Sequence, residues 1–191
     1  MIIKIYLASK SPRRQQLLKQ IGVEFEIIDV DIDEQWDGIE NVRHYVERLA
    51  LEKAQAGKIK LNSDKNIAVL GADTAVVLDD QILGKAQSND DARRMLKSLS
   101  ERMHHVYSAV TLITDKEEKT KTSISRVSFR PLTDRDIENY CNTGEPIGKA
   151  GAYAVQGRAA AFIERLEGSY SGLMGLPLYE TTELLKSAGI I

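Results

Sequence analysis

Segments with two different hydrophobic periods alternate along the chain. Nearly continuous apolar or β-branched stretches, typical of buried strands, occur over residues 2–8, 25–30, 67–78, 106–114 and 123–129. Apolar residues at intervals of three or four predict helices over residues 12–21, 42–57, 90–99, 133–141 and 178–186. Asp79 and Asp80 predict a tight turn into a short strand over 81–83, and the glycine-rich stretch 144–175 has no assigned element. The alternation predicts an α/β fold with helices flanking a twisted mixed sheet.

The composition limits the classes of protein to which this chain can belong. With 191 residues, 42% hydrophobic and 28% charged, it can bury the core of one large domain or of two small lobes. The formal net charge of −2 gives no general attraction to nucleic acid or to a membrane surface. The single cysteine, Cys141, excludes an internal disulfide and agrees with a cytoplasmic location. No apolar run has the length of a signal-peptide core or a membrane span.

The run Ser9-Lys10-Ser11-Pro12-Arg13-Arg14 joins the first predicted strand to the first predicted helix. Ser11 is typical of an N-cap and Pro12 of the first helical position, so Arg13 and Arg14 fall in the first turn. A cation at this position makes the helix roughly 0.3–1 kcal/mol less stable than an acidic residue would, because a helix N-terminus carries partial positive charge. A bound oligophosphate would compensate, since hydroxyl, guanidinium and free N–H groups all donate to phosphate oxygens. The alternative is a solvated basic helix start.

Two carboxylates have unusual positions in the hydrophobic pattern. Asp73 interrupts the buried strand over 67–78, where an ionised carboxylate is costly unless it is paired or bound to a metal. Glu34 lies in the acidic run over 29–34. The alternatives are a strand-end cap in a bulge for Asp73 and a solvated loop for Glu34.

Two lysines complete the set of charged candidates. Lys53 continues the apolar face of the helix over 42–57, and Lys85 follows the flexible Gly84 at the close of the hairpin. A lysine that snorkels at a helix end and a solvated hairpin lysine are the alternatives. Taken together, the cations can hold phosphates, while the carboxylates can hold a hard divalent cation and activate water. This set suits nucleophilic attack on a nucleotide phosphate.

The same residues belong to motifs that resemble the Maf family of nucleoside triphosphate pyrophosphatases, in the family's order and spacing nearly from end to end. The motifs are Ser9-Lys10-Ser11-Pro12-Arg13-Arg14, Glu52-Lys53-Ala54, Gly71-Ala72-Asp73-Thr74, Leu83-Gly84-Lys85, Ser128-Phe129-Arg130, Lys149-Ala150-Gly151-Ala152-Tyr153, Gln156-Gly157 and Gly175-Leu176-Pro177-Leu178. The resemblance implies a Maf/inosine-triphosphatase-like fold: one domain over 1–191, with an elongated sheet and two lobes around a cleft. It also implies metal-dependent cleavage between the α and β phosphates of a nucleoside triphosphate.

The resemblance assigns roles to individual positions. Asp73 matches the family's general base, and Glu34 matches an acidic residue implicated in metal handling or catalysis, so that Glu34 and Asp73 are the expected ligands of Mg, Mn or Co. The positions that match the polar and basic residues of the phosphate cleft are Ser9, Ser11, Arg14, Lys53 and Lys85. Lys10 departs from the small residue common between the two serines, and its added charge is a candidate influence on phosphate affinity. A homodimer is compatible with the sequence.

Three positions distinguish subgroups of the family. The subgroup acting on dTTP and UTP has Arg, Thr and Gln where this chain has Arg13, Thr74 and Gln156. A related subgroup acting on 7-methyl-GTP has Trp, Gln and Glu there. A Gln amide can pair with the donor and acceptor edge of uracil or thymine. The resemblance therefore implies a house-cleaning pyrophosphatase for dTTP and UTP.

Other functions stay open at this point. A non-catalytic nucleotide-binding regulator of septum formation would keep the arginines but need no Asp73, and an enzyme for modified pyrimidine nucleotides or 7-methyl-GTP would keep the catalytic set. Tyr153 is a candidate platform for stacking on a base, although core packing is the commoner role of an aromatic residue. His104 and His105 point to opposite faces of a strand and are not expected to share a metal.

Overall fold

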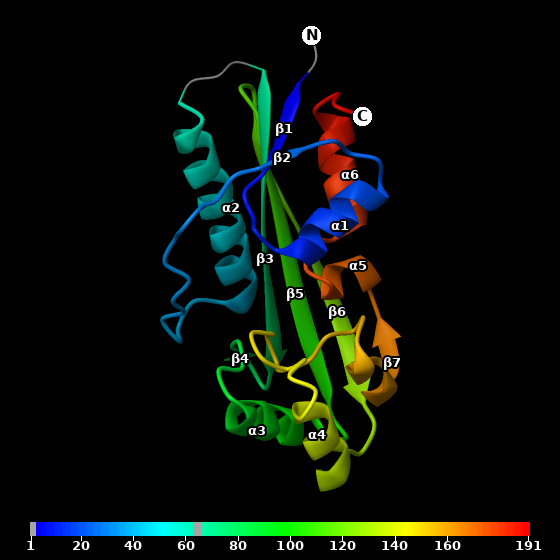
Figure 1. Ribbon diagram of the computed structural model, residues 1–191. Coiled ribbons are helices and arrows are strands. Elements are labelled where there is room, and N and C mark those ends of the chain that lie inside the picture. The colour runs from blue at the N-terminus through cyan, green and yellow to red at the C-terminus, as the bar shows by residue number, and fades with distance from the viewer. Residues whose placement is uncertain (1–2, 63–65) are drawn as a thin grey trace.

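The computed structural model describes residues 3–62 and 66–191, so Ile2, in the first predicted strand, lies outside the described residues. One mixed sheet has the order β2-β1-β3-β5-β6-β7, with β4 paired to β3 (Figure 1). β1 is parallel to β2 and β3, and the other pairings are antiparallel. The strands are β1 (Lys4–Leu7), β2 (Glu26–Ile27), β3 (Ile67–Leu78), β4 (Gln81–Leu83), β5 (Met103–Ile113), β6 (Glu118–Phe129) and β7 (Ile163–Glu167). The predicted mixed sheet is confirmed.

Helices cover both faces of this sheet (Figure 1). The helices are α1 (Pro12–Gln20), α2 (Val42–Lys60), α3 (Asn89–Leu99), α4 (Asp134–Cys141), α5 (Tyr170–Leu173) and α6 (Leu178–Ser187), with a 3₁₀ helix over Arg158–Phe162. α2 packs on one face of β3 and β5, while α1 and α6 share a buried cluster with β1, β3 and β5 on the other. α3 and α4 lie together at the far end of the long strands. Within the described ranges, no helix combines the length and apolarity needed to cross a membrane.

Local sequence signals explain several boundaries. Asp79 and Asp80 have φ values of 49° and 61°, in the left-handed region. A two-residue hairpin turn needs this conformation so that its backbone matches the right-handed twist of the flanking strands. Gly22 has φ 74° and its N–H donates to the carbonyl of Lys19, so it ends α1 as predicted, although it lies one residue after the C-cap, Ile21. Thr133 and Asp136 form the reciprocal capping box at the start of α4, also as predicted.

Strand lengths differ from those predicted. The strand predicted over 25–30 is only the exposed pair β2, whereas β5 and β6 begin three and five residues earlier than predicted. The extra residues of β6, Glu118–Thr122, are polar and mostly exposed, so their hydrophobic pattern gave no strand signal even though β5 pairs with them. β7 was missed inside the glycine-rich stretch because it is a short strand with charged residues, as edge strands often are.

A gap in the sheet lies along one edge of β3. β1 pairs with β3 as far as Leu70, and β4 pairs with it from Val76 onward. Between these two points, residues 71–75 have no strand partner on that side within the described part of the chain. Their other edge pairs continuously with β5. The edge of β3 at Asp73 is therefore free of strand pairing on that side, and β3 passes through Asp73 without the bulge considered from the sequence.

Gly71 sets the distance between α2 and β3 beside this gap. A Cβ at Gly71 would lie 2.1 Å from the carbonyl oxygen of Ala50 and 2.6 Å from the amide nitrogen of Ala54, both in α2. Only glycine permits that approach. Because Lys53 lies on the same turn of α2, the close packing brings its side chain to Asp73, two residues beyond Gly71 on the same face of β3.

Candidate active site

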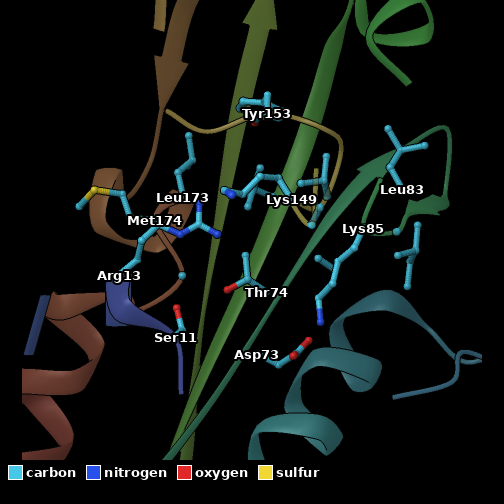
Figure 2. A pocket seen from close by; sticks show the side chains of 18 of the residues that line it. Ser11, Arg13, Asp73, Thr74, Leu83, Lys85, Lys149, Tyr153, Leu173 and Met174 are labelled. Carbon is cyan, nitrogen blue, oxygen red and sulfur yellow. The ribbon is translucent and has the colours of Figure 1, made fainter. Parts of the chain in front are cut away.

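A pocket of about 680 Å³ lies over the gap in β3, and Figure 2 shows part of its lining. The loop after β1, the end of the β3–β4 hairpin, α2 and the segments around Lys149 and Gly175 all contribute to its walls. The charged lining residues are Arg13, Arg14, Lys53, Lys85, Lys149, Glu34 and Asp73. Five cations against two carboxylates leave an excess of three positive charges, although the whole chain carries a net charge of −2. The basic site is therefore local, as the composition requires.

Lys53 connects the two predicted carboxylates. Its Nζ lies 2.7 Å from Oδ1 of Asp73 and 2.7 Å from Oε1 of Glu34. The side chains of Lys53 and Asp73 are only 9% and 10% exposed, which excludes the snorkelling lysine considered from the sequence. Lys85 reaches the other oxygen of Glu34 at 3.1 Å. The structure thus brings together four residues from α2, β3 and two loops, although they lie up to 51 positions apart in sequence.

The charge state of this cluster follows from its contacts. Burial acts to raise the pKa of Glu34, but hydrogen bonds and positive charge from Lys53 and Lys85 dominate and lower it to about 2. Tyr45 donates a hydrogen bond to the backbone carbonyl of Glu34 at 2.7 Å and fixes the loop that carries it. Burial, together with the charges of Asp73 and Glu34, raises the pKa of Tyr45 to about 12. Glu34 is therefore ionised and Tyr45 neutral at neutral pH.

The start of α1 forms the opposite wall of the pocket. Ser11 is at the N-cap and Pro12 at the first helical position, as predicted, but the Ser11 side chain makes no capping hydrogen bond. Arg14 donates from Nε to the carbonyl of Gly175 at 2.8 Å and from a terminal nitrogen to Ser9 Oγ at 3.3 Å. Burial lowers the pKa of Arg13 and of Arg14, although guanidinium groups remain charged. Ser11, Arg13 and Arg14 line the pocket, whereas Ser9 acts on it by holding Arg14.

The three expected specificity positions differ in their placement. Arg13 and Thr74 line the pocket, and Thr74 shares a 2.8 Å hydrogen bond with Ser108. Gln156 is exposed and is not part of the lining, although its neighbour Val155 is. The structure therefore brings two of the three positions together.

Tyr153 lines the pocket from a buried position, and its hydroxyl lies 2.9 Å from Nε2 of His104. Nδ1 of His104 is buried and has no hydrogen-bond partner among the described residues. Which of the two groups donates in this hydrogen bond depends on the tautomer of His104. His104 and His105 lie on opposite faces, as predicted, and the buried His104 fixes the orientation of an aromatic wall of the pocket.

The positions of Lys10 and Lys149 differ from what the sequence led us to expect. Lys10 pairs with Asp29 at 2.6 Å and is not among the lining residues, so the extra charge that it adds lies outside the pocket. Lys149 does line the pocket, yet sequence reasoning gave it no role. It lies in a polar, glycine-rich loop, where a lysine is most often solvated, so only its position within a motif could have identified it.

Comparison with known proteins identifies the family of this chain. The family model described as Maf-like protein matches residues 4–188. The chain belongs to the Maf family. A protein named dTTP/UTP pyrophosphatase from Aromatoleum aromaticum (strain DSM 19018 / LMG 30748 / EbN1) is 52% identical to this Maf protein, over 97% of this chain and 96% of the relative. Another of that name, from Alkalilimnicola ehrlichii (strain ATCC BAA-1101 / DSM 17681 / MLHE-1), is 50% identical over 95% and 91% of the two chains.

A solved structure has the same fold at low sequence identity. The Ham1 protein of Staphylococcus aureus matches 97% of this Maf protein and 97% of its own chain, with a TM-score of 0.54 and 14% identity. This likeness confirms the predicted α/β architecture of a mixed sheet flanked by helices.

The donor chemistry at Asp73 and Glu34 fits a hard divalent cation. Both carboxylates contact one ammonium group, so their oxygens already converge on a single positive charge. Mg²⁺ typically uses one or two carboxylates and completes its shell with water and substrate phosphates. Over residues 3–62 and 66–191, no group of three acidic, histidine or cysteine ligands is present, so phosphate oxygens would have to complete such a shell.

Proposed function

We propose that this Maf protein hydrolyses dTTP and UTP to the nucleoside monophosphate and pyrophosphate. The observation that carries the proposal is the pairing of a buried Asp73 with Lys53 in a pocket that holds three excess positive charges. The relatives named above support the choice of substrate. We propose further that the pocket is the cleft between two lobes of a single domain over 1–191.

In the proposed reaction, Asp73 takes a proton from water and the water oxygen attacks the α-phosphorus. The bond between that phosphorus and the oxygen bridging to the β-phosphate breaks, and pyrophosphate leaves with the bonding electrons. Lys53 and Lys85 neutralise the charge that develops on the phosphate oxygens, because donors placed in advance stabilise a transition state without reorganisation. Glu34 and Asp73 would hold a divalent cation, which would polarise the phosphate and lower the pKa of bound water.

Arg13, Thr74 and Gln156 are proposed to select the base. An amide at Gln156 can donate to and accept from a pyrimidine edge, whereas a glutamate would face the acceptor oxygens of uracil with a negative charge. An unpaired buried acceptor costs roughly 1–3 kcal/mol, which is about 10- to 100-fold in specificity. The triple variant Arg13→Trp, Thr74→Gln and Gln156→Glu should lower the ratio of kcat/KM for UTP to that for 7-methyl-GTP by that factor. An unchanged ratio in a folded variant would remove these residues from base selection.

A panel experiment tests the proposed function as a whole. Purified protein with Mg²⁺ is incubated with dTTP, UTP, 7-methyl-GTP and modified pyrimidine nucleotides, and the products are separated by chromatography. We expect monophosphate and pyrophosphate, with dTTP and UTP cleaved faster than 7-methyl-GTP. Orthophosphate and diphosphate as first products would contradict the reaction type. Tight binding without turnover of any nucleotide would favour the non-catalytic regulator, for which the paired Asp73 would have no purpose.

A further inference from the structure

Residues 153–157, called the wall segment below, form part of one side of the pocket. Tyr153 and Val155 line the pocket, and Gln156, which is proposed to select the base, follows them in the chain. None of these residues, all of which the structure describes, belongs to a helix or a strand. The position of the wall segment therefore depends on its contacts with the rest of the molecule.

Tyr140 in α4 holds the start of the wall segment. Its hydroxyl accepts a hydrogen bond from the amide of Ala154 at 3.3 Å and donates one to Oε1 of Glu145 at 2.8 Å. A neutral hydroxyl has one proton to donate and lone pairs to accept, so both bonds form at once. Burial and the hydrogen bond to Glu145 raise the pKa of Tyr140, which keeps the hydroxyl neutral. Tyr140 thus links the amide of Ala154 to the carboxylate of Glu145.

Glu145 holds the other end of the wall segment. Its second oxygen, Oε2, accepts a hydrogen bond from the amide of Arg158 at 3.1 Å. The amide of Glu145 itself donates to Oγ1 of Thr143 at 3.1 Å, which fixes the residue to the turn after α4. One carboxylate therefore acts on both ends of the wall segment. Hydrogen bonds to an ionised acceptor are roughly twice as strong as those between neutral groups.

Gly157 leaves the space that this carboxylate occupies. Its φ of −108° lies outside the left-handed region, so the backbone conformation does not call for glycine. A Cβ at this position would instead overlap Glu145, because its three nearest atoms would all belong to the carboxyl group of that residue. Even Oε2, the farthest of the three, would lie only 2.5 Å away. The contact with Glu145 therefore accounts for a glycine directly after Gln156.

We propose that Glu145 is a positioning residue of the pocket, which holds the wall segment through Tyr140 and the Arg158 amide, and that Gly157 admits its carboxylate. The inference rests on the proposed function for the contact between Gln156 and the base, whereas the anchoring rests on the contacts above. Without the anchor, the wall segment would adopt its binding conformation for only a fraction of the time. The apparent affinity for a nucleotide would fall by that fraction.

The groups proposed to react lie apart from the wall segment. Lys53 and Asp73 belong to α2 and β3 and pair with each other at 2.7 Å. Figure 2 shows Tyr153 and Asp73 at opposite ends of the view. Loss of the Glu145 anchor should therefore weaken the binding of a nucleotide while leaving the binding of a phosphate chain alone unchanged.

Calorimetric titration of the full chain at constant Mg²⁺ tests the proposal, with α,β-imido-UTP as a nucleotide that is not cleaved between the α and β phosphates. Glu145→Ala should weaken binding of this analogue about 10-fold, the loss expected when hydrogen bonds to a charged acceptor are removed. Inorganic pyrophosphate should bind within about twofold of its wild-type affinity. Glu145→Gln keeps one acceptor oxygen for two donors and should give an intermediate loss. Glu164→Ala removes an exposed glutamate outside the pocket lining and should match the wild type.

Gly157→Ala provides a second test of the same contact. In the wild type, the added methyl group must displace the carboxyl group of Glu145, so the analogue should bind about as weakly as it does to Glu145→Ala. In the Glu145→Ala background that group is absent, so Gly157→Ala should change the affinity by less than about twofold further.

The possible outcomes separate this inference from the proposed function. Unchanged affinity for the analogue in folded Glu145→Ala overturns the inference, even if the wild type hydrolyses UTP as proposed. Equal weakening of the analogue and pyrophosphate also overturns it, because the defect would then not be confined to the wall segment. Additive losses in the double variant would show that Gly157 acts through other contacts and would overturn its part. Glu145-dependent binding of the analogue by a protein that cleaves no nucleotide would support the inference and refute the proposed function.

Discussion

Replacing Gly71 with alanine tests the close packing that brings α2 to the active site. The added Cβ would lie 2.1 Å from the carbonyl oxygen of Ala50 and 2.6 Å from the amide nitrogen of Ala54. Carbon atoms do not approach backbone atoms below about 3 Å, so α2 must retreat by roughly 1 Å, a shift that typically costs about 1–3 kcal/mol. The free energy of unfolding should fall by that amount in urea titrations.

The same shift should affect catalysis through Lys53. Its Nζ lies 2.7 Å from both Asp73 and Glu34, and a retreat of α2 would lengthen these contacts. A misplacement of about 1 Å can cost 10²-fold in rate when it alters the geometry of reacting groups. In steady-state assays of pyrophosphate release from UTP, Gly71→Ala should therefore lower kcat by about that factor, with a smaller change in KM.

Two comparisons make this reasoning refutable. Gly84→Ala adds the same methyl group where no atom lies within 4 Å, so the free energy of unfolding should change by less than about 0.5 kcal/mol. Ala54→Gly introduced into Gly71→Ala should restore neither stability nor rate, because the nearest clashing atoms belong to the α2 backbone and not to the side chain. Wild-type stability and rate in Gly71→Ala, or rescue by Ala54→Gly, would refute the account.

Three further results are expected. Burial lowers the pKa of His104 to about 4, whereas a histidine in the unfolded chain has a pKa near 6.5, so the unfolded chain takes up a proton first as the pH falls. The free energy of unfolding should therefore drop by up to about 3 kcal/mol between about pH 6.5 and pH 4, and urea titrations of His104→Gln should lack this part of the drop. Thr133→Ala removes the capping box of α4 and should cost about 1 kcal/mol in the same titrations, without a change in kcat, since α4 does not line the pocket. Lys53→Met leaves the buried Asp73 without its cation and should cost about 3 kcal/mol in thermal or urea unfolding; equal stability would show that the pair is not effectively buried.

The architecture could be predicted where hydrophobic periodicity and turn chemistry agree. β3 has the predicted bounds because it is buried on both faces, and the turn at Asp79 and Asp80 follows from residues that tolerate positive φ. The start of β6 and the whole of β7 could not be predicted, because their exposed residues carry no apolar signal. Their pairing depends on neighbours far away in the sequence.

Part of the candidate site could be predicted as individual residues, but Lys149 was missed, Gln156 lies outside the pocket lining, and the geometry could not be predicted. Asp73 and Lys53 stand out because charged residues on apolar faces need partners, and the structure pairs them with each other. The role of Gly71 could not be inferred, since a strand glycine alone does not reveal which backbone approaches it. The free edge of β3 at residues 71–75 depends on where β1 ends and β4 begins, which is a property of the register.

Asp73→Asn tests the central claim most directly, because asparagine keeps the size of the side chain and removes its basicity. The measurement is the rate of pyrophosphate release from UTP at saturating Mg²⁺, alongside calorimetric binding of UTP. We expect the rate to fall by about 10²-fold or more, as the loss of a general base typically causes, while UTP still binds. A folded Asp73→Asn variant that releases pyrophosphate at the wild-type rate would contradict the account and make Glu34 the first candidate for the base.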